Sequence, residues 1–152
     1  LDAKDLSRPQ ANLQEEYDVV VLGDIIEHVT NPEEVLVASS SRIGKNGELI
    51  VTTANAFHLY GFLRALTGGE CTHPDHVAYY SPMNLMELFS RSGLQIIEMR
   101  GYVEDAYREN PLKRLVRHTE RACMALFPGT SCGIICRAKR IGVVPVQRAA
   151  DG

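Results

Sequence analysis

The stretch YDVVVLGDIIEHVTNPEEVL, residues 17–36, decides the fold. Its first six residues form an almost uninterrupted, valine-rich apolar run, which is typical of a strand covered on both faces in a parallel sheet. The run ends at Gly23 and Asp24. Asn31 then offers a helix N-cap, followed by a proline and two acidic residues that suit the first helical turn. This order predicts a central strand and then a helix that runs to about Ile43.

Strand and helix patterns keep alternating downstream of this stretch. The segment ELIVTT, residues 48–53, is short and β-branched and predicts the next strand, after a turn at residues 44–47. A strand, a helix and a strand with short joints form a parallel crossover unit, which is almost always right-handed. The other elements expected from periodicity and end signals are helices at 57–66, 81–93 and 111–127, and strands at 95–103 and 131–138.

This order of elements predicts an α/β fold with a mostly parallel sheet. In such sheets a ligand lies beyond the carboxyl ends of the parallel strands. Residues 23–28 and 55–58 follow two of these ends and are expected at the site. An apolar segment leaves the second end, and it is expected either to line a pocket for an acceptor or to join the core. Its apolar residues are Phe57, Leu59, Tyr60 and Phe62.

Composition and charge narrow the possible classes of protein. With 152 residues, 45% of them hydrophobic, the chain is long enough for one domain with a core. The net charge of -3 leaves no large basic face, so nucleic acid is not expected as a partner. No apolar run reaches the roughly 18 residues of a membrane span. The four cysteines form no CxxC pair, as expected of reduced thiols in a cytoplasmic protein.

Three segments together resemble a known family. They are YDVVVLGDIIEHVTNPEEVL, then IGKNGELIVTTAN at 43–55, then HPDHVAYYSPMNLMELFSRSGLQIIEMRGY at 73–102. Their order is similar to the motifs that follow the glycine-rich loop of class I S-adenosylmethionine-dependent methyltransferases, particularly the small-molecule branch that includes ubiquinone-biosynthesis O-methyltransferases. The resemblance covers about residues 1–102. It implies the carboxyl-terminal part of a Rossmann-like fold, with a mostly parallel sheet and an antiparallel last strand.

The same resemblance implies a cofactor, S-adenosylmethionine, and positions that would meet it. Asp2 and Ala3 match the acidic-small pair that meets the adenine. Leu22, Gly23 and Asp24 match the positions that lie along the methionine part. The family's glycine-rich loop and ribose-binding acid fall upstream of this sequence, so the chain is expected to supply only the latter part of the cofactor pocket.

The domain organisation follows from these observations. The sequence lacks an initiator methionine and begins within a pattern, so we expect a portion of a longer protein. Residues 1–140 are expected to form part of one methyltransferase domain, and residues 141–152 a flexible tail. If this portion folds alone, one edge of the strand at 17–22 stays open, and an open apolar edge favours self-association.

The chemistry expected of this site is mainly alignment, because a sulfonium methyl group is already activated. A hydroxyl acceptor also needs a base, and histidine suits that role near neutral pH. His28 follows the strand that faces the cofactor, while His76 lies in the loop expected to cover it, with His73 close by in sequence. We therefore expect His28 and His76 to be catalytic. For each, a purely structural role in its loop is the alternative.

Metal assistance is a further alternative. Asp24, Glu27 and His28 stand as D-x-x-E-H. Some O-methyltransferases, including those acting on small-RNA ends, resemble this with E-x-x-E-H and a later histidine that together hold a divalent ion. Here the later histidine would be His76 or His73. We expect no metal, with Asp24 contacting the cofactor and Glu27 tying the loop.

The expected function is therefore methyl transfer from S-adenosylmethionine to a small molecule, and the resemblance implies an oxygen as the acceptor atom. A Rossmann-type NAD(P)-dependent oxidoreductase shares the element order but would carry a G-x-G-x-x-G fingerprint, which this sequence lacks. A non-catalytic, degenerate methyltransferase module is the other rival. A basic helix surface is expected to be solvated, with an anionic partner as the alternative. Its residues are Lys113, Arg114, Arg117, His118 and Arg121.

Overall fold

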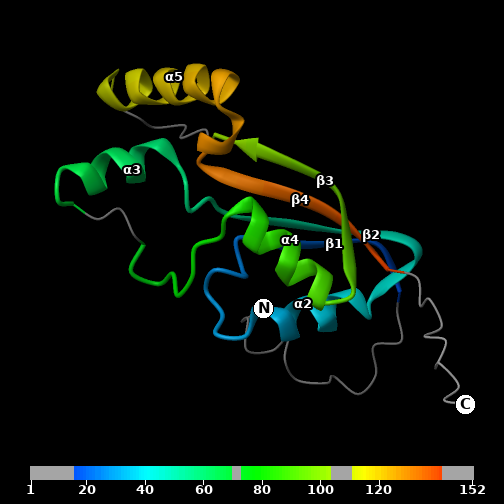
Figure 1. Ribbon diagram of the computed structural model, residues 1–152. Coiled ribbons are helices and arrows are strands. Elements are labelled where there is room, and N and C mark those ends of the chain that lie inside the picture. The colour runs from blue at the N-terminus through cyan, green and yellow to red at the C-terminus, as the bar shows by residue number, and fades with distance from the viewer. Residues whose placement is uncertain (1–15, 70–72, 104–110, 142–152) are drawn as a thin grey trace, which may run out of the picture.

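The computed structural model describes residues 16–69, 73–103 and 111–141. Within these residues helices and strands alternate as the hydrophobic pattern predicts (Figure 1). The elements are β1 (Tyr17–Gly23), α2 (Pro32–Ser40), β2 (Ile43–Ala54), α3 (Leu59–Leu66), α4 (Pro82–Arg91), β3 (Leu94–Tyr102), α5 (Pro111–Leu126), the 3-10 helix η1 (Pro128–Thr130) and β4 (Gly133–Arg140). Asp2, Ala3 and most of the expected tail lie outside the described residues.

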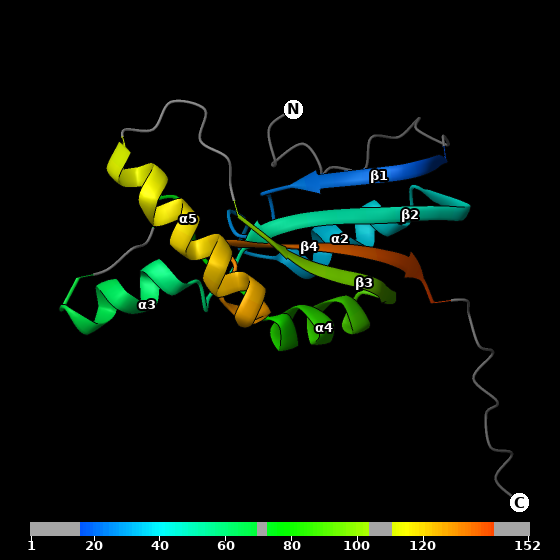
Figure 2. The ribbon, with the colours of Figure 1, turned by 90° about the horizontal axis from the view of Figure 1, so that it is seen from above.

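The four described strands form one sheet in the order β1-β2-β4-β3. β1 and β2 are parallel, and β4 runs antiparallel to both of its neighbours, β2 and β3. Thus β1, β2 and β3 share one direction and only β4, the last strand, is reversed. This confirms the α/β, Rossmann-like prediction of a mostly parallel sheet with an antiparallel last strand. α3 and α5 lie toward the end of the sheet where the three co-directional strands finish (Figure 2).

The start of β2 differs from the prediction. The first helix ends at Ser40 rather than near Ile43, and Ile43 instead opens a 12-residue strand that pairs with Tyr17. The glycines at 44–47 therefore lie in the strand and not in a separate turn. A Cβ on Gly47 would stand 2.6 Å from the Tyr17 carbonyl oxygen, so this glycine permits the close approach of the two backbones.

The position of β1 also differs from the prediction of a central strand. In the described part of the chain β1 is an edge strand with β2 as its neighbour. Val19 and Val21 are 53% and 60% exposed, because α2 and α4 cover the opposite face of the sheet. The open edge is thus present among the described residues, and self-association through it stays a prediction.

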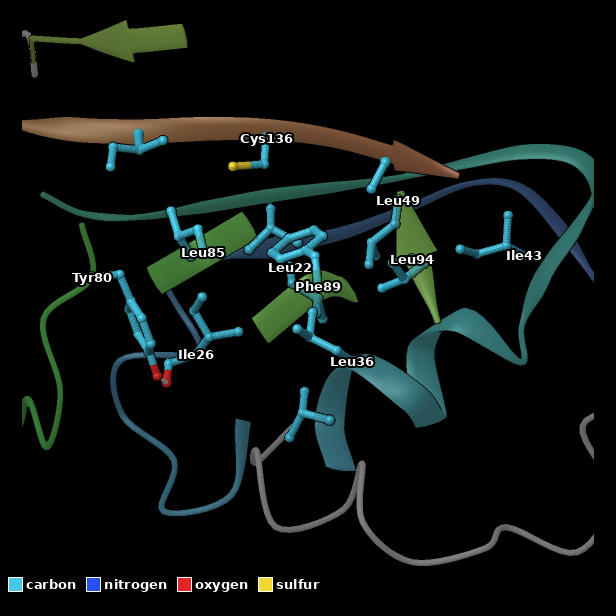
Figure 3. Packing of buried hydrophobic residues seen from close by; sticks show 14 residues of the cluster. Leu22, Ile26, Leu36, Ile43, Leu49, Tyr80, Leu85, Phe89, Leu94 and Cys136 are labelled. Carbon is cyan, nitrogen blue, oxygen red and sulfur yellow. Dashed lines mark hydrogen bonds between the residues drawn. The ribbon is translucent and has the colours of Figure 1, made fainter. Parts of the chain in front are cut away.

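The core lies between the sheet and the helices α2 and α4 (Figure 3). Leu36 of α2 and Phe89 of α4 are fully buried, and they pack with Leu22 of β1 and Leu49 of β2. The other face of the sheet carries charged side chains. There Arg137 of β4 forms ion pairs with Glu48 of β2 and Glu98 of β3. The covered face therefore fixes the ends of the strands relative to one another.

The helix caps that the sequence predicts are present in the structure. The Asn31 side chain accepts a hydrogen bond from the backbone of Glu34, and Ser81 does the same for Asn84 at the start of α4. Gly93, just past the end of α4, adopts a φ of 71°, the left-handed conformation of a C′ glycine. The sequence signals for helix ends therefore give the boundaries of α4 directly.

Replacing Ser81 with alanine is expected to lower the free energy of unfolding by about 1–2 kcal/mol, because the first turn of α4 loses its cap. The Ser81 hydroxyl also donates to Asn84 Oδ1 at 2.6 Å, and the residue is buried. Urea unfolding followed by circular dichroism measures the change. Ser90→Ala, on an exposed site of the same helix, is the matched control. Equal effects of the two changes would contradict the capping role.

Candidate active site

The loop after β1 begins with an unusual backbone conformation. Asp24 has a φ of 49°, the positive value that favours glycine, and it is the one non-glycine residue with such a φ in the described ranges. Its backbone N–H donates to the carbonyl and to the hydroxyl of Thr52 in β2, both at 3.1 Å. The same hydroxyl donates to Asp24 Oδ1 at 3.0 Å, and the Tyr102 hydroxyl reaches Oδ1 at 3.4 Å. The end of β1 is thereby fixed against two other strands.

Glu27 lies beneath this loop and is 1% exposed. Its Oε1 accepts a hydrogen bond from the backbone of Ala54 at 3.3 Å, and its carbonyl accepts from Val77 at 2.8 Å and from Ala78 at 3.3 Å. Glu27 therefore joins the end of β2 to the loop that precedes α4. Its Oε2 is buried and has no hydrogen-bond partner among the described residues. A buried carboxylate oxygen without a partner is costly and points to a missing one.

Three histidine rings gather above Glu27. The centroids of His28 and His76 are 4.6 Å apart with the rings nearly perpendicular, and those of His73 and His76 are 4.9 Å apart. His28 Nδ1 lies 3.0 Å from the carbonyl oxygen of Asp75. Since a carbonyl can only accept, this contact assigns the proton to Nδ1 and leaves Nε2 as the acceptor of neutral His28.

His76 is the least exposed of these rings, and its Nδ1 is buried without a partner in the described part of the chain. Burial lowers the pKa of His76, and the neighbouring His28 lowers it further, while the nearby carboxylate of Glu27 acts in the opposite direction. A lowered pKa keeps the imidazole neutral at physiological pH. The neutral ring can accept a proton or bind a cation.

Glu27, His28 and His76 each offer one ligand atom, and these atoms all lie within 4.8 Å of one another. The set of one carboxylate and two imidazoles suits a divalent ion such as Mn²⁺ or Zn²⁺. The partnerless Oε2 of Glu27 and Nδ1 of His76 fit such an ion, since both atoms have lone pairs to share. The residues present therefore fit a metal.

Glu27 and His76, but not His28, line a cavity of about 280 Å³ at the ends of the strands. The sequence led us to expect Asp24 and His76 here, and the structure brings them together with Glu27. Tyr102, from the end of β3, was not foreseen. Cys132, which precedes β4, and Gly133, the first residue of β4, were not foreseen either. The lining residues are Asp24, Glu27, Ala54, His73, His76, Tyr102, Cys132 and Gly133.

A second cavity of about 440 Å³ lies beside α3, where an acceptor pocket or core packing was expected. Phe57 and Phe62 line it and remain 62% and 61% exposed, so this segment is not core in the described structure. Leu59 also lines the cavity, whereas Tyr60 is outside its lining and 43% exposed. The pocket interpretation of the segment is thus the better supported of the two.

The other predicted positions are placed as follows. The side chain of Leu22 is buried in the core, so only its backbone could reach a ligand, whereas Gly23 is exposed at the strand end. His28 is exposed and is not among the residues that line the cavity. On α5, His118 and Arg121 are exposed. The side chains of Lys113, Arg114 and Arg117 lie outside the described ones.

Rossmann-like enzyme domains have a mostly parallel α/β sheet with a ligand site at the strand ends. The described sheet, with its reversed last strand and a polar cavity at the strand ends, has this arrangement. Residues 2–99 match the family model of a methyltransferase domain, which is more than half of the sequence. The chain therefore belongs to the methyltransferase-domain family.

Comparisons with individual proteins agree with this family. The ubiquinone biosynthesis O-methyltransferase of Cupriavidus pinatubonensis is 29% identical over 106 residues, which are 64% of this chain and 40% of that protein. A SAM-dependent methyltransferase from Archaeoglobus fulgidus superposes with a TM-score of 0.58 at 14% identity, over 92% of this chain and 66% of that one. The magnesium protoporphyrin IX methyltransferase of Synechocystis, solved with bound SAH, gives 0.53 at 15% identity, over 88% and 49%. The chain spans less than half of the curated relative's length.

None of the helices in the described ranges combines the length and the apolar character needed to cross a lipid bilayer. The expectation of no membrane-spanning helix agrees with this finding.

Proposed function

We propose that the whole protein transfers a methyl group from S-adenosylmethionine to an oxygen of a small-molecule acceptor, in the cytoplasm. The observation that carries this proposal is the cavity at the strand ends, where Asp24, Glu27 and His76 meet in a chain of the methyltransferase family. Relatives named as O-methyltransferases support the choice of oxygen. The net charge of -3 and the small cavity favour a small molecule over nucleic acid.

The cofactor is proposed to lie along the end of β1, at Leu22, Gly23 and Asp24, with Asp2 and Ala3 at its adenine. Two features support the β1 end. Gly23 is exposed, and a Cβ built on it would have its nearest neighbour 3.9 Å away, so its backbone is open to a ligand. Asp24 turns the chain away from the sheet and presents a carboxylate beside that backbone. The ammonium and sulfonium of the cofactor are both positive and suit a carboxylate there.

His28 and His76 are proposed to handle the proton of the acceptor hydroxyl. The Nδ1–H of His28 donates a hydrogen bond to the carbonyl oxygen of Asp75. The other ring nitrogen, Nε2, is then the one that can accept a proton. The lowered pKa of His76 keeps this ring neutral and ready to accept. In-line alignment of the acceptor with the methyl group remains the main contribution of the site.

A divalent ion is a second candidate element of this function, favoured by the two partnerless ligand atoms. Glu27, His28 and His76 would hold it. When bound, such an ion lowers the pKa of a coordinated hydroxyl and orients it. The geometry thus gives the metal alternative more support than the D-x-x-E-H spacing alone.

Calorimetric titration of the full-length protein is expected to show binding of S-adenosylhomocysteine and none of NAD⁺. Incubation with methyl-labelled S-adenosylmethionine and a panel of phenols is then expected to label an acceptor. Binding of NAD⁺ instead would favour the oxidoreductase, and binding of neither compound would favour the non-catalytic module. Either result would refute the proposed function.

A further inference from the structure

We propose that Thr52 and Tyr102 are positioning residues that hold the carboxylate of Asp24 at the cavity wall, where it receives a positively charged ligand group. This inference rests on the proposed function, because the positive group would come from the cofactor or from a bound divalent ion. It adds two residues from other strands to the site. Neither belongs to the D-x-x-E-H motif.

Thr52 binds Asp24 in both directions. Its hydroxyl accepts from the Asp24 backbone N–H at 3.1 Å and donates to Asp24 Oδ1 at 3.0 Å. Register places Thr52 directly opposite Gly23, the last residue of β1. One hydroxyl therefore fixes both the backbone turn and the direction of the carboxylate. The positive φ of Asp24 is a conformation that surrounding contacts must maintain, and Thr52 supplies three of these through its side chain and carbonyl.

Tyr102 approaches the same oxygen from β3, the opposite edge strand of the described sheet. Its hydroxyl lies 3.4 Å from Asp24 Oδ1, although β2 and β4 separate β1 from β3. Gly133 makes room for this reach, because a Cβ there would overlap the Tyr102 ring. At 3.4 Å the hydrogen bond is long, so Tyr102 is expected to contribute less than Thr52.

The position of Asp24 argues for a ligand rather than for a purely structural bond. A carboxylate that only closed a turn could face solvent anywhere, but Asp24 lines the cavity with Glu27 and His76. Asp24 is not part of the group of close ligand atoms that Glu27, His28 and His76 form among the described residues. The contacts that orient its carboxylate come instead from the hydroxyls of Thr52 and Tyr102. A fixed, exposed carboxylate at a cavity wall attracts a cation without reorganisation on binding.

The test compares Thr52→Val with Thr52→Ser in the full-length protein. In calorimetry with S-adenosylmethionine, S-adenosylhomocysteine and Mn²⁺, the probe whose positive charge Asp24 receives is expected to bind Thr52→Val about 10-fold more weakly than the wild type, and to recover to within about 2-fold in Thr52→Ser. Tyr102→Phe should weaken binding by about 2–3-fold. The matched control is Thr53→Val, since the Thr53 hydroxyl points to the opposite face and has no partner in the described part of the chain.

A double-mutant cycle separates positioning from a merely structural role. If Thr52 acts through Asp24, adding Thr52→Val to Asp24→Asn should cause no further loss of affinity. Losses that multiply, or a Thr52→Val protein that binds like the wild type, would overturn the inference while leaving the methyltransferase proposal standing. Loss confined to Mn²⁺ would support positioning and identify the cation as the ion. A wild-type protein that binds none of the three probes would overturn both proposals.

Discussion

Glu27→Gln is expected to weaken Mn²⁺ binding by about 100-fold or more, because it removes the only carboxylate of the ligand group found in the described residues. The amide oxygen can still accept the hydrogen bond from Ala54, so the loop should keep its position. The measurement is calorimetric titration of the full-length protein with Mn²⁺, followed by the rate of methyl transfer in the same buffer. Glu33→Gln, an exposed acid in the first turn of α2, is the control.

The stability of the same variant is expected to change in the opposite direction. In the ion-free protein Glu27 buries a carboxylate oxygen without a partner, so replacing the charge should raise the free energy of unfolding by about 1 kcal/mol. A residue that served only to tie the loop would show no such gain, because the amide oxygen keeps the hydrogen bond from Ala54. Unchanged Mn²⁺ affinity in the variant, or no Mn²⁺ binding by the wild type, would remove the metal and leave His28 and His76 as the proposed groups.

Phe89→Ala is expected to lower the free energy of unfolding by about 3–5 kcal/mol, the cost of a large cavity in a packed core. Phe89 is fully buried between α4 and the sheet, where it packs within the cluster that includes Leu22 and Leu36 (Figure 3). Urea unfolding measures the loss. Met86→Ala, on the same helix and 51% exposed, should change stability by less than about 0.5 kcal/mol.

A second core variant keeps this prediction testable if Phe89→Ala does not fold. Phe89→Leu retains most of the apolar volume and is expected to cost about 1–2 kcal/mol. A core variant that is no less stable than Met86→Ala would show that the layer between α4 and the sheet is not the core of this domain.

Local signals predicted the elements whose boundaries depend on neighbouring residues. The apolar run at 17–22 forms β1, and Asn31 and Ser81 cap the helices that follow them. Gly93 ends α4 because its positive φ is local backbone chemistry. The same local reasoning failed at Gly47, since its turn-like composition reflects the close approach of β1, a contact between segments almost thirty residues apart.

The candidate site was predictable only in part. Asp24, Glu27 and His28 are neighbours in sequence, so their grouping followed from the motif. His76 joined them as one of two alternatives, and the choice between His73 and His76 depends on burial, which spacing cannot give. The partnerless atoms of Glu27 and His76 exist only once the loops pack together.

The sequence by itself determined the order of strands and helices, their caps and the D-x-x-E-H segment, because hydrophobic period, capping and motif spacing act within a few residues. The tertiary structure alone decided that Thr52 and Tyr102 meet Asp24, and that β4 inserts between β2 and β3. These contacts join segments 28 and 78 residues apart. They form because burial of one sheet face against α2 and α4 fixes the strand ends together, a cooperative result that no local pattern encodes.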